Sequence, residues 1–169
     1  MEERQKQIAK SWGQSIIEAL LILAILFVFL WPARVEGISM QPTVADGNRI
    51  MFCRLMAKLE MYDCGDLIVF DDDDSDKDMI KRIIAVEGDY LEIFGGNVYV
   101  NGIKIEEEYV TGITNGEISL EIPKDTVFVM GDNREHSIDS RTYGVVGIDE
   151  IYGKVILRFF PLNKLTLFV

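Results

Sequence analysis

The sequence predicts a mainly β fold, with an antiparallel barrel-like or sandwich-like core, preceded by one N-terminal transmembrane helix. Two observations predict it. A long apolar run lies close to the N-terminus, and many short segments of β-forming residues, separated by Gly and Asn turns, follow it. The chain has 169 residues, of which ~135 remain after the apolar run, enough for one domain with a hydrophobic core.

The apolar run predicts a membrane anchor over residues 12–32. Trp12 and Trp31 bracket it, as aromatic residues do at the two interfaces of a membrane, and Glu18 is its only charged residue. A helix of ~19 residues is ~28 Å long, close to the ~30 Å apolar core of a bilayer. A cleavable signal peptide is the alternative, but the small residues of a cleavage site are lacking after Trp31.

Basic residues predict the orientation of this anchor. Three precede it, at Arg4, Lys6 and Lys10, whereas Arg34 is the only cation shortly behind it. By the positive-inside rule, residues 1–11 lie in the cytoplasm and residues 33–169 form an extracytoplasmic domain. The protein is therefore expected in the plasma membrane, with a single pass through the lipid bilayer.

Composition bears on several kinds of site. The net charge of −11 argues against binding to nucleic acid. Cys53 and Cys64 either form a disulfide or remain free thiols, and without a Cys/His cluster no zinc site is expected. The acidic segment of residues 71–78 has Lys77 and Ile83 where a calcium loop needs Gly and Glu, so it is predicted to be a solvated loop between strands. No metal and no cofactor are expected.

The predicted strands share β-forming residues, alternating polarity and turn residues at their ends. They cover residues 66–70, 79–86, 90–93, 98–100, 103–105, 118–122, 126–130, 144–148 and 153–160. Only residues 54–62 indicate a helical turn or two. This pattern is typical of an antiparallel β domain.

Ser39 is a candidate nucleophile, because it lies on a turn between Gly37 and Pro42, a few residues outside the predicted anchor. A serine hydroxyl needs a base to take its proton. His136, the only histidine, lies in the polar segment of residues 131–141, where a solvated side chain is more common than a catalytic one.

Lys81 is the stronger candidate base, because it is embedded in an apolar strand segment. Burial disfavours the ammonium and lowers the pKa of a lysine, so a neutral Lys81 could accept the proton of Ser39. The pattern alone leaves an alternative open, in which Lys81 faces solvent and Arg82 faces inward.

Four groups of polar and glycine-containing motifs occur in one order along the chain. They are Ser39-Met40-Gln41-Pro42-Thr43; Gly65-Asp66 with Val69-Phe70; Lys81-Arg82-Ile83-Ile84-Ala85 with Gly88-Asp89; and Gly131-Asp132-Asn133-Arg134 with Ser137, Asp139-Ser140-Arg141 and Gly144. The set resembles the type I signal peptidases, membrane-anchored Ser-Lys serine endopeptidases that remove signal peptides from exported preproteins. The single anchor and Gly37 are similar to the short forms common in Gram-positive bacteria.

The resemblance implies roles for particular residues. Ser39 would be the nucleophile that forms an acyl-enzyme, and Lys81 the general base. Ser137 would orient the lysine amine, with Asp139 and Arg141 as a supporting ion pair behind it. Arg82, next to the base, would be structural.

The resemblance also implies how the transition state and the substrate are bound. The backbone N–H of Ser39 would donate to the oxyanion, and Gly37 lacks the side-chain donor that some members carry at that position. Residues 87–124 would form a smaller β extension. The extended signal peptide would lie along a strand edge, with its small residues in pockets lined by Ile38, Met40, Pro42, Ile80 and Ile83.

Partners implied by the resemblance are signal peptides, the bilayer and, as a further candidate, a secretion translocon. The alternative from another class is a catalytically silent, membrane-anchored β module that binds secreted peptides. A binding module would have no need of the polar set formed by Ser39, Lys81, Ser137, Asp139 and Arg141. A self-cleaving repressor would need a DNA-binding N-terminal domain in place of the apolar run.

Overall fold

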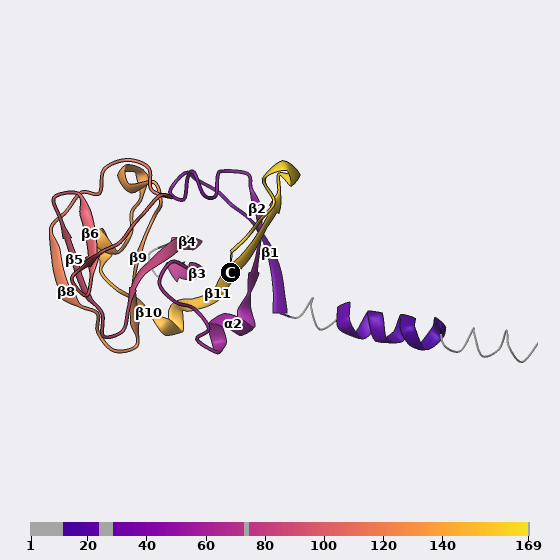
Figure 1. The fold of residues 1–169 in the computed structure, drawn as a ribbon. Helices are drawn as coiled ribbons and strands as arrows, with labels where there is room; N and C mark the ends of the chain where they lie inside the picture. The colour runs from indigo at the N-terminus through magenta and orange to yellow at the C-terminus, as the bar shows by residue number, and fades with distance from the viewer. Residues whose placement is uncertain (1–11, 24–28, 73–74, 169) are drawn as a thin grey trace, which may run out of the picture.

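The computed structural model describes residues 12–23, 29–72 and 75–168, and the side chains of residues 72–77 lie outside this description. Residues 12–23 are helical (Figure 1). Within the described ranges, no helix combines the length and the apolar character needed to cross a membrane. Residues 1–11 and 24–28, on which the predicted anchor and its orientation partly depend, are not among the described residues.

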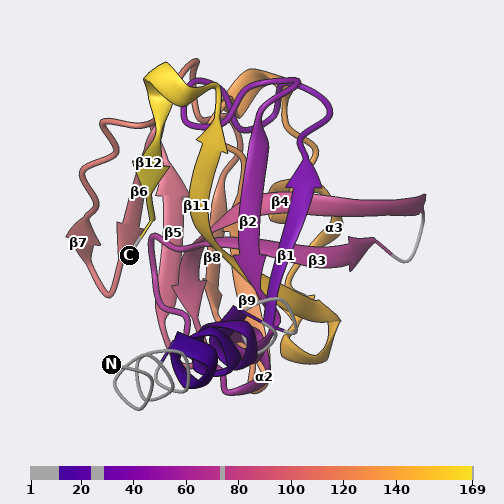
Figure 2. The same cartoon turned by 90° about the vertical axis from the view of Figure 1, so that its right-hand side faces the viewer.

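The fold is mainly β and antiparallel, as predicted, and its larger sheet is curled but open (Figures 1 and 2). Among the described residues, this sheet has eight strands in the order β1-β2-β11-β3-β4-β9-β10, with β12 paired to β11. The strands are β1 (Leu30–Arg34), β2 (Arg49–Cys53), β3 (Leu67–Asp72), β4 (Ser75–Val86), β9 (Thr126–Met130), β10 (Val146–Gly147), β11 (Ile151–Phe160) and β12 (Thr166–Leu167).

A second, smaller sheet lies at the other end of the domain from β1 and β2 (Figure 1). Its strands, in the order β7-β6-β5-β8, are β5 (Tyr90–Phe94), β6 (Asn97–Val100), β7 (Ile103–Lys104) and β8 (Ile118–Glu121), within the range expected for the extension. The short helices are α2 (Arg54–Lys58), α3 (Ser140–Tyr143), η1 (Arg134–His136), η2 (Ile148–Glu150) and η3 (Leu162–Lys164).

Successive side chains of β4 and β9 point alternately into two core clusters, and one of these clusters also contains residues of the small sheet. Ile83 and Val129 face one core cluster, whereas Ile84 and Phe128 face another that also contains Leu91 of the small sheet. Successive side chains of a strand point to opposite faces, so strands covered on both faces bury consecutive residues. This double coverage explains why residues 127–130 of β9 and 83–86 of β4 are consecutive apolar residues.

Three strands were not predicted from the sequence: β1, β2 and β12. The end of the expected anchor, residues 30–32, lies in β1, where Leu30 pairs with Cys53 and Pro32 with Met51. β1 is an edge strand, and an edge tolerates a proline because one side of its backbone needs no partner. A short apolar run does not by itself distinguish strand from helix, which is why β1 was merged with the helix before it.

The acidic segment of residues 71–78 is not a simple loop, contrary to the prediction. Asp71 and Asp72 end β3, Ser75 begins β4, and Asp72 pairs with Ser75. The hairpin extends beyond the rest of the sheet (Figure 2). Both cysteines, Cys53 and Cys64, are free thiols, the first buried and the second exposed.

Candidate active site

Ser39 lies on a tight turn between β1 and β2, and apolar side chains hold this turn on the core. Met40 and Val44 are both buried in the cluster beneath β1 and β2, and Val44 N donates to Met40 O over 2.8 Å. Gly37 has a φ of +96°, a backbone conformation that favours glycine, and its N–H donates to Asp46 Oδ1 over 3.0 Å. These contacts leave the Ser39 side chain facing outward from the core.

Asn133, after β9, holds the same turn from the opposite side. Its backbone N–H donates to Ser39 O over 2.9 Å, and its side-chain Nδ2 donates to Ile38 O over 3.2 Å. The carbonyl groups of Ile38 and Ser39 are therefore both bound by one residue. The sequence motif contained Asn133, but no spacing rule indicated this contact.

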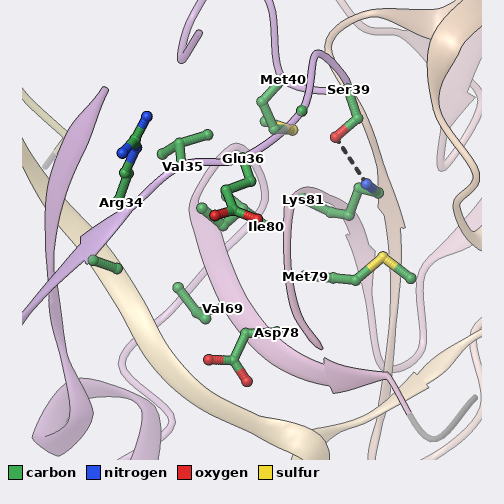
Figure 3. A pocket seen from close by; sticks show the side chains of 12 residues that line it. Arg34, Val35, Glu36, Ser39, Met40, Val69, Asp78, Met79, Ile80 and Lys81 are labelled. Atoms are coloured by element: carbon green, nitrogen blue, oxygen red, sulfur yellow. Dashed lines mark hydrogen bonds between the residues drawn. The ribbon is translucent and has the colours of Figure 1, made fainter. Parts of the chain in front are cut away.

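Lys81 points from β4 toward Ser39, and its Nζ lies 3.0 Å from Ser39 Oγ (Figure 3). Only 4% of Lys81 is exposed, and Arg82 is buried as well. The alternative in which Lys81 faces solvent is therefore wrong. Both neighbours are buried because β4 is covered on both faces, as described above.

A groove of about 550 Å³ runs beside this pair (Figure 3). One wall is formed by the chain from Ala33 to Gly37 and the other by residues 78–81 of β4, with both Ser39 and Lys81 in its lining. Strand residues contribute to both walls, since Ala33 and Arg34 belong to β1 and residues 78–81 belong to β4.

The residues predicted to bind substrate divide into two sets. Met40 and Ile80 line the groove, whereas Ile38 and Pro42 do not. Ile83 is fully buried in the core, because it lies on the face of β4 that packs against Val127 and Val129. The groove instead contains charged residues that were not singled out from the sequence, among them Glu36 and Asp78.

Asp139 and Arg141 form the expected ion pair. Arg141 Nε donates to Asp139 Oδ1 over 2.8 Å and its NH2 to Oδ2 over 2.9 Å, while Gly131 N donates to Oδ2 over 3.0 Å. Burial raises the pKa of the Asp139 carboxyl, but the hydrogen bonds from Arg141 and Gly131 outweigh burial and lower this pKa below its ordinary value of 3.8. Asp139 is therefore a carboxylate at neutral pH.

Ser137 lies between these groups. Its hydroxyl also helps to lower the pKa of Asp139, as the weakest of the causes. Ser137 Oγ is buried, and within the described part of the chain no group meets it with hydrogen-bonding geometry. The structure thus does not contain the expected hydrogen bond between Ser137 and Lys81.

A second buried ion pair joins Arg82 to Asp132. Arg82 Nε lies 2.9 Å from Asp132 Oδ1, and Arg82 Nη2 lies 2.7 Å from Asp132 Oδ2. The Thr43 hydroxyl also donates to Asp132 Oδ2. The Arg82 guanidinium stacks 3.9 Å from the centroid of the Tyr109 ring. Asp132 was a motif residue without an assigned role; here it connects the strand of Lys81 to the turn of Ser39.

His136 takes no part in the Ser39–Lys81 arrangement. Its side chain is exposed, and its Nδ1 lies 3.1 Å from Asn133 Oδ1. Within the described residues, no cluster of three or more His, Cys, Asp or Glu side chains could hold a metal ion. The geometry therefore offers a serine with a buried lysine amine beside it, and this pair has the arrangement of nucleophile and base.

Comparison with known proteins gives concordant matches. A family model described as "Signal peptidase, peptidase S26" matches residues 9–160. Signal peptidase I U of Bacillus subtilis is 35% identical over 161 residues, with 89% of this chain and 86% of the relative covered. Signal peptidase IB of Staphylococcus aureus is 36% identical over 174 residues, with 90% of each covered.

A solved structure is also similar. The crystal structure of a signal peptidase I from Enterococcus faecalis superposes with a TM-score of 0.50 and 26% sequence identity, covering 55% of this chain and 95% of that one. The similarity is in accord with the curled antiparallel sheet described above.

Proposed function

Because the chain belongs to the signal peptidase family, peptidase S26, and is thus a serine peptidase of the kind that cleaves signal peptides, we propose that Ser39 and Lys81 are its catalytic pair. The observation that carries this proposal is the 3.0 Å distance between Lys81 Nζ and Ser39 Oγ beside an open groove. Burial of Lys81 favours the neutral amine, which is the form that a general base needs.

In the proposed reaction, the Lys81 amine takes the hydroxyl proton as Ser39 Oγ attacks the scissile carbonyl carbon. The tetrahedral intermediate then collapses. The peptide C–N bond breaks, the leaving amine takes the proton from Lys81, and Ser39 carries an acyl ester. Lys81 next removes a proton from water, and the resulting attack on the ester releases the acid and restores the Ser39 hydroxyl.

The oxyanion would be bound mainly by backbone. Within the described residues, Ser39 N–H donates to no protein acceptor, so it is available to the developing charge. Gly37 has no side-chain donor, and its own N–H is already bound to Asp46 Oδ1. A second donor would then come from water or from another backbone group near Ser39. One such donor typically contributes a factor of about 10²–10³ in rate.

Ser137, Asp139 and Arg141 would support this pair. The ion pair holds the loop after β9 in place, since both of its members also bind backbone groups of that loop. Ser137 Oγ is buried next to this ion pair, close enough to the Asp139 carboxylate to help lower its pKa, and in the proposed site it would also accept a hydrogen bond from the lysine amine.

The substrate would bind as an extended strand in the groove. β4 pairs with β9 only from Arg82 onward, so residues 78–81 present an open backbone edge on that side. A signal peptide could pair with this edge through main-chain hydrogen bonds, with small residues at positions −1 and −3 facing the groove floor. An anchor over residues 12–32, with the catalytic domain outside the plasma membrane, would bring the site to membrane-inserted substrates.

Cleavage of an exported preprotein tests this function. The full chain should cleave the parent preprotein and not a variant with a bulky residue at position −1, whereas Ser39→Ala and Lys81→Ala should lose about 10⁴-fold or more in kcat. Cleavage by either variant at the parent rate would exclude the catalytic pair. No cleavage by the parent protein would instead support the silent binding module.

A further inference from the structure

Arg158 of β11 lies outside every motif discussed above, yet its side chain joins the C-terminal segment to the turn of the nucleophile. Its Nε donates to Lys164 O over 2.8 Å, and its NH2 donates to Thr166 Oγ1 over 2.6 Å. Its NH1 donates to the backbone carbonyl of Thr43. One guanidinium thus binds three acceptors, two on the segment after β11 and one on the catalytic turn.

Thr43 is well placed to transmit this contact. It follows Ser39 by four residues on the same turn, and its hydroxyl donates to Asp132, the partner of Arg82. Arg82 is the neighbour of Lys81 in β4. The residue held by Arg158 therefore also links the turn of Ser39 to the strand of Lys81, through Asp132 and Arg82.

The C-terminal segment also packs against the core on which this turn rests. Phe168 N donates to Ile156 O over 2.9 Å, and the Phe168 side chain packs against the core cluster that contains Met40 and Val44. β12 pairs with β11 at Leu157 and Arg158, which fixes the direction of the segment. Arg158 is the charged residue at the centre of this contact.

We propose that Arg158 is a positioning residue for Ser39, acting through the carbonyl of Thr43. This inference rests on the proposed catalytic pair. A base must lie within hydrogen-bonding distance of its nucleophile, and a displacement of about 1 Å can cost about 10²-fold in rate. Without Arg158, the Thr43 carbonyl loses a charged donor, and the turn keeps its contacts with Asn133, the bond from the Thr43 hydroxyl to Asp132 and its apolar packing.

Kinetics of Arg158 variants test the proposal. Arg158→Ala should lower kcat about tenfold or more, with KM within about twofold of the parent value, because the groove walls lie elsewhere. Arg158→Lys should restore part of the loss, since an ammonium can still donate to Thr43 O. If Arg158→Ala does not fold, Arg158→Met, which keeps the length of the side chain but has no N–H donor, takes its place, with the same expected loss in kcat. A parent-like kcat in the Ala variant would overturn the proposal.

Thr166→Val is the matched control. It removes one acceptor of the Arg158 guanidinium on the C-terminal segment and leaves the donor to Thr43 in place, so its kcat should stay within about twofold of the parent value. A loss equal to that of Arg158→Ala would show that order in the C-terminal segment, rather than the contact with Thr43, is what matters, and the proposal would fail.

Hydrogen exchange separates this proposal from the proposed function. Backbone amides of residues 38–45 should exchange faster in Arg158→Ala than in the parent protein, and at the parent rate in Thr166→Val. This readout needs no substrate. A parent chain that cleaves no preprotein would refute the proposed function, while unchanged exchange in Arg158→Ala would refute the role of Arg158.

Discussion

Gly131 and Ser137 are packed so closely that residue 131 has no room for a side chain. A Cβ atom on Gly131 would lie 2.3 Å from Ser137 Oγ and 2.6 Å from the backbone oxygen of Ser39. The loop after β9 can therefore contact the catalytic turn only because residue 131 is glycine. This contact brings Ser137 and Asn133 next to Ser39.

Gly131→Ala is expected to disturb the site more than the fold. The added methyl group must push apart the loop and the turn, which should lower kcat about 100-fold and the free energy of unfolding by about 1–3 kcal/mol. Preprotein cleavage and urea unfolding measure the two effects. Gly13→Ala, on the N-terminal helix with open space around it, is the control. Parent-like activity of Gly131→Ala would contradict the packing described here.

Asn133→Asp tests whether the side-chain amide holds the turn that carries Ser39. The substitution keeps the size of the side chain but replaces the donor to Ile38 O with an oxygen, so kcat should fall about tenfold. The measurement is kcat for preprotein cleavage, with KM expected to stay at the parent value. His136→Gln alters the other partner of this side chain and should keep parent-like activity; a large loss there would reinstate His136 as a catalytic candidate.

Glu107→Gln tests how the loop before β8 is attached to the loop after β9. Arg134 is fully buried; it donates to both oxygens of Glu107 and to Thr114 Oγ1 over 2.7 Å. Without the carboxylate, a buried guanidinium loses its counter-charge, and the free energy of unfolding should fall by ~3 kcal/mol. Urea unfolding measures the loss. Glu106→Gln, at the exposed neighbouring position, is the control. Equal stabilities of the two variants would contradict a stabilising role for the buried pair of Arg134 and Glu107.

Asp139 makes the stability depend on pH in the acid range. Its pKa in the folded protein is below the ordinary 3.8, so the unfolded chain binds the proton more readily. The stability contributed by the carboxylate is therefore present above about pH 4 and is lost as pH falls through the folded-state pKa.

Unfolding of Asp139→Asn as a function of pH measures this contribution. The variant should be less stable than the parent by ~3 kcal/mol at about pH 7, and the difference should shrink below about pH 4. Arg141→Gln, which removes the partner, should show the same trend. A parent–variant difference that does not change with pH would mean that Asp139 has an ordinary pKa.

Local sequence determined most of the strands of this protein, and the family motifs indicated Ser39 and Lys81 as its candidate catalytic pair. Residues 126–130 form β9 as predicted, because alternation and β-forming residues act over a few neighbouring positions. β1 escaped prediction because its apolar residues continue the run before them, and its partner, β2, follows a turn of fourteen residues from Val35 to Asn48. Whether two strands pair across such a long connection depends on the fold of the whole chain and cannot be seen in the residues of either strand.

The family motifs indicated Ser39 and Lys81 as candidate catalytic residues. Only the tertiary structure showed that their side chains lie within hydrogen-bonding distance. Forty-two residues separate the two in sequence, and their 3.0 Å distance depends on a turn held by the core and on a strand buried on both faces. Arg82, Asp132, Asn133 and Arg158 hold these parts together by long-range hydrogen bonds. A sequence pattern records which residues are present, whereas burial and hydrogen bonding between distant segments decide which of them lie in contact.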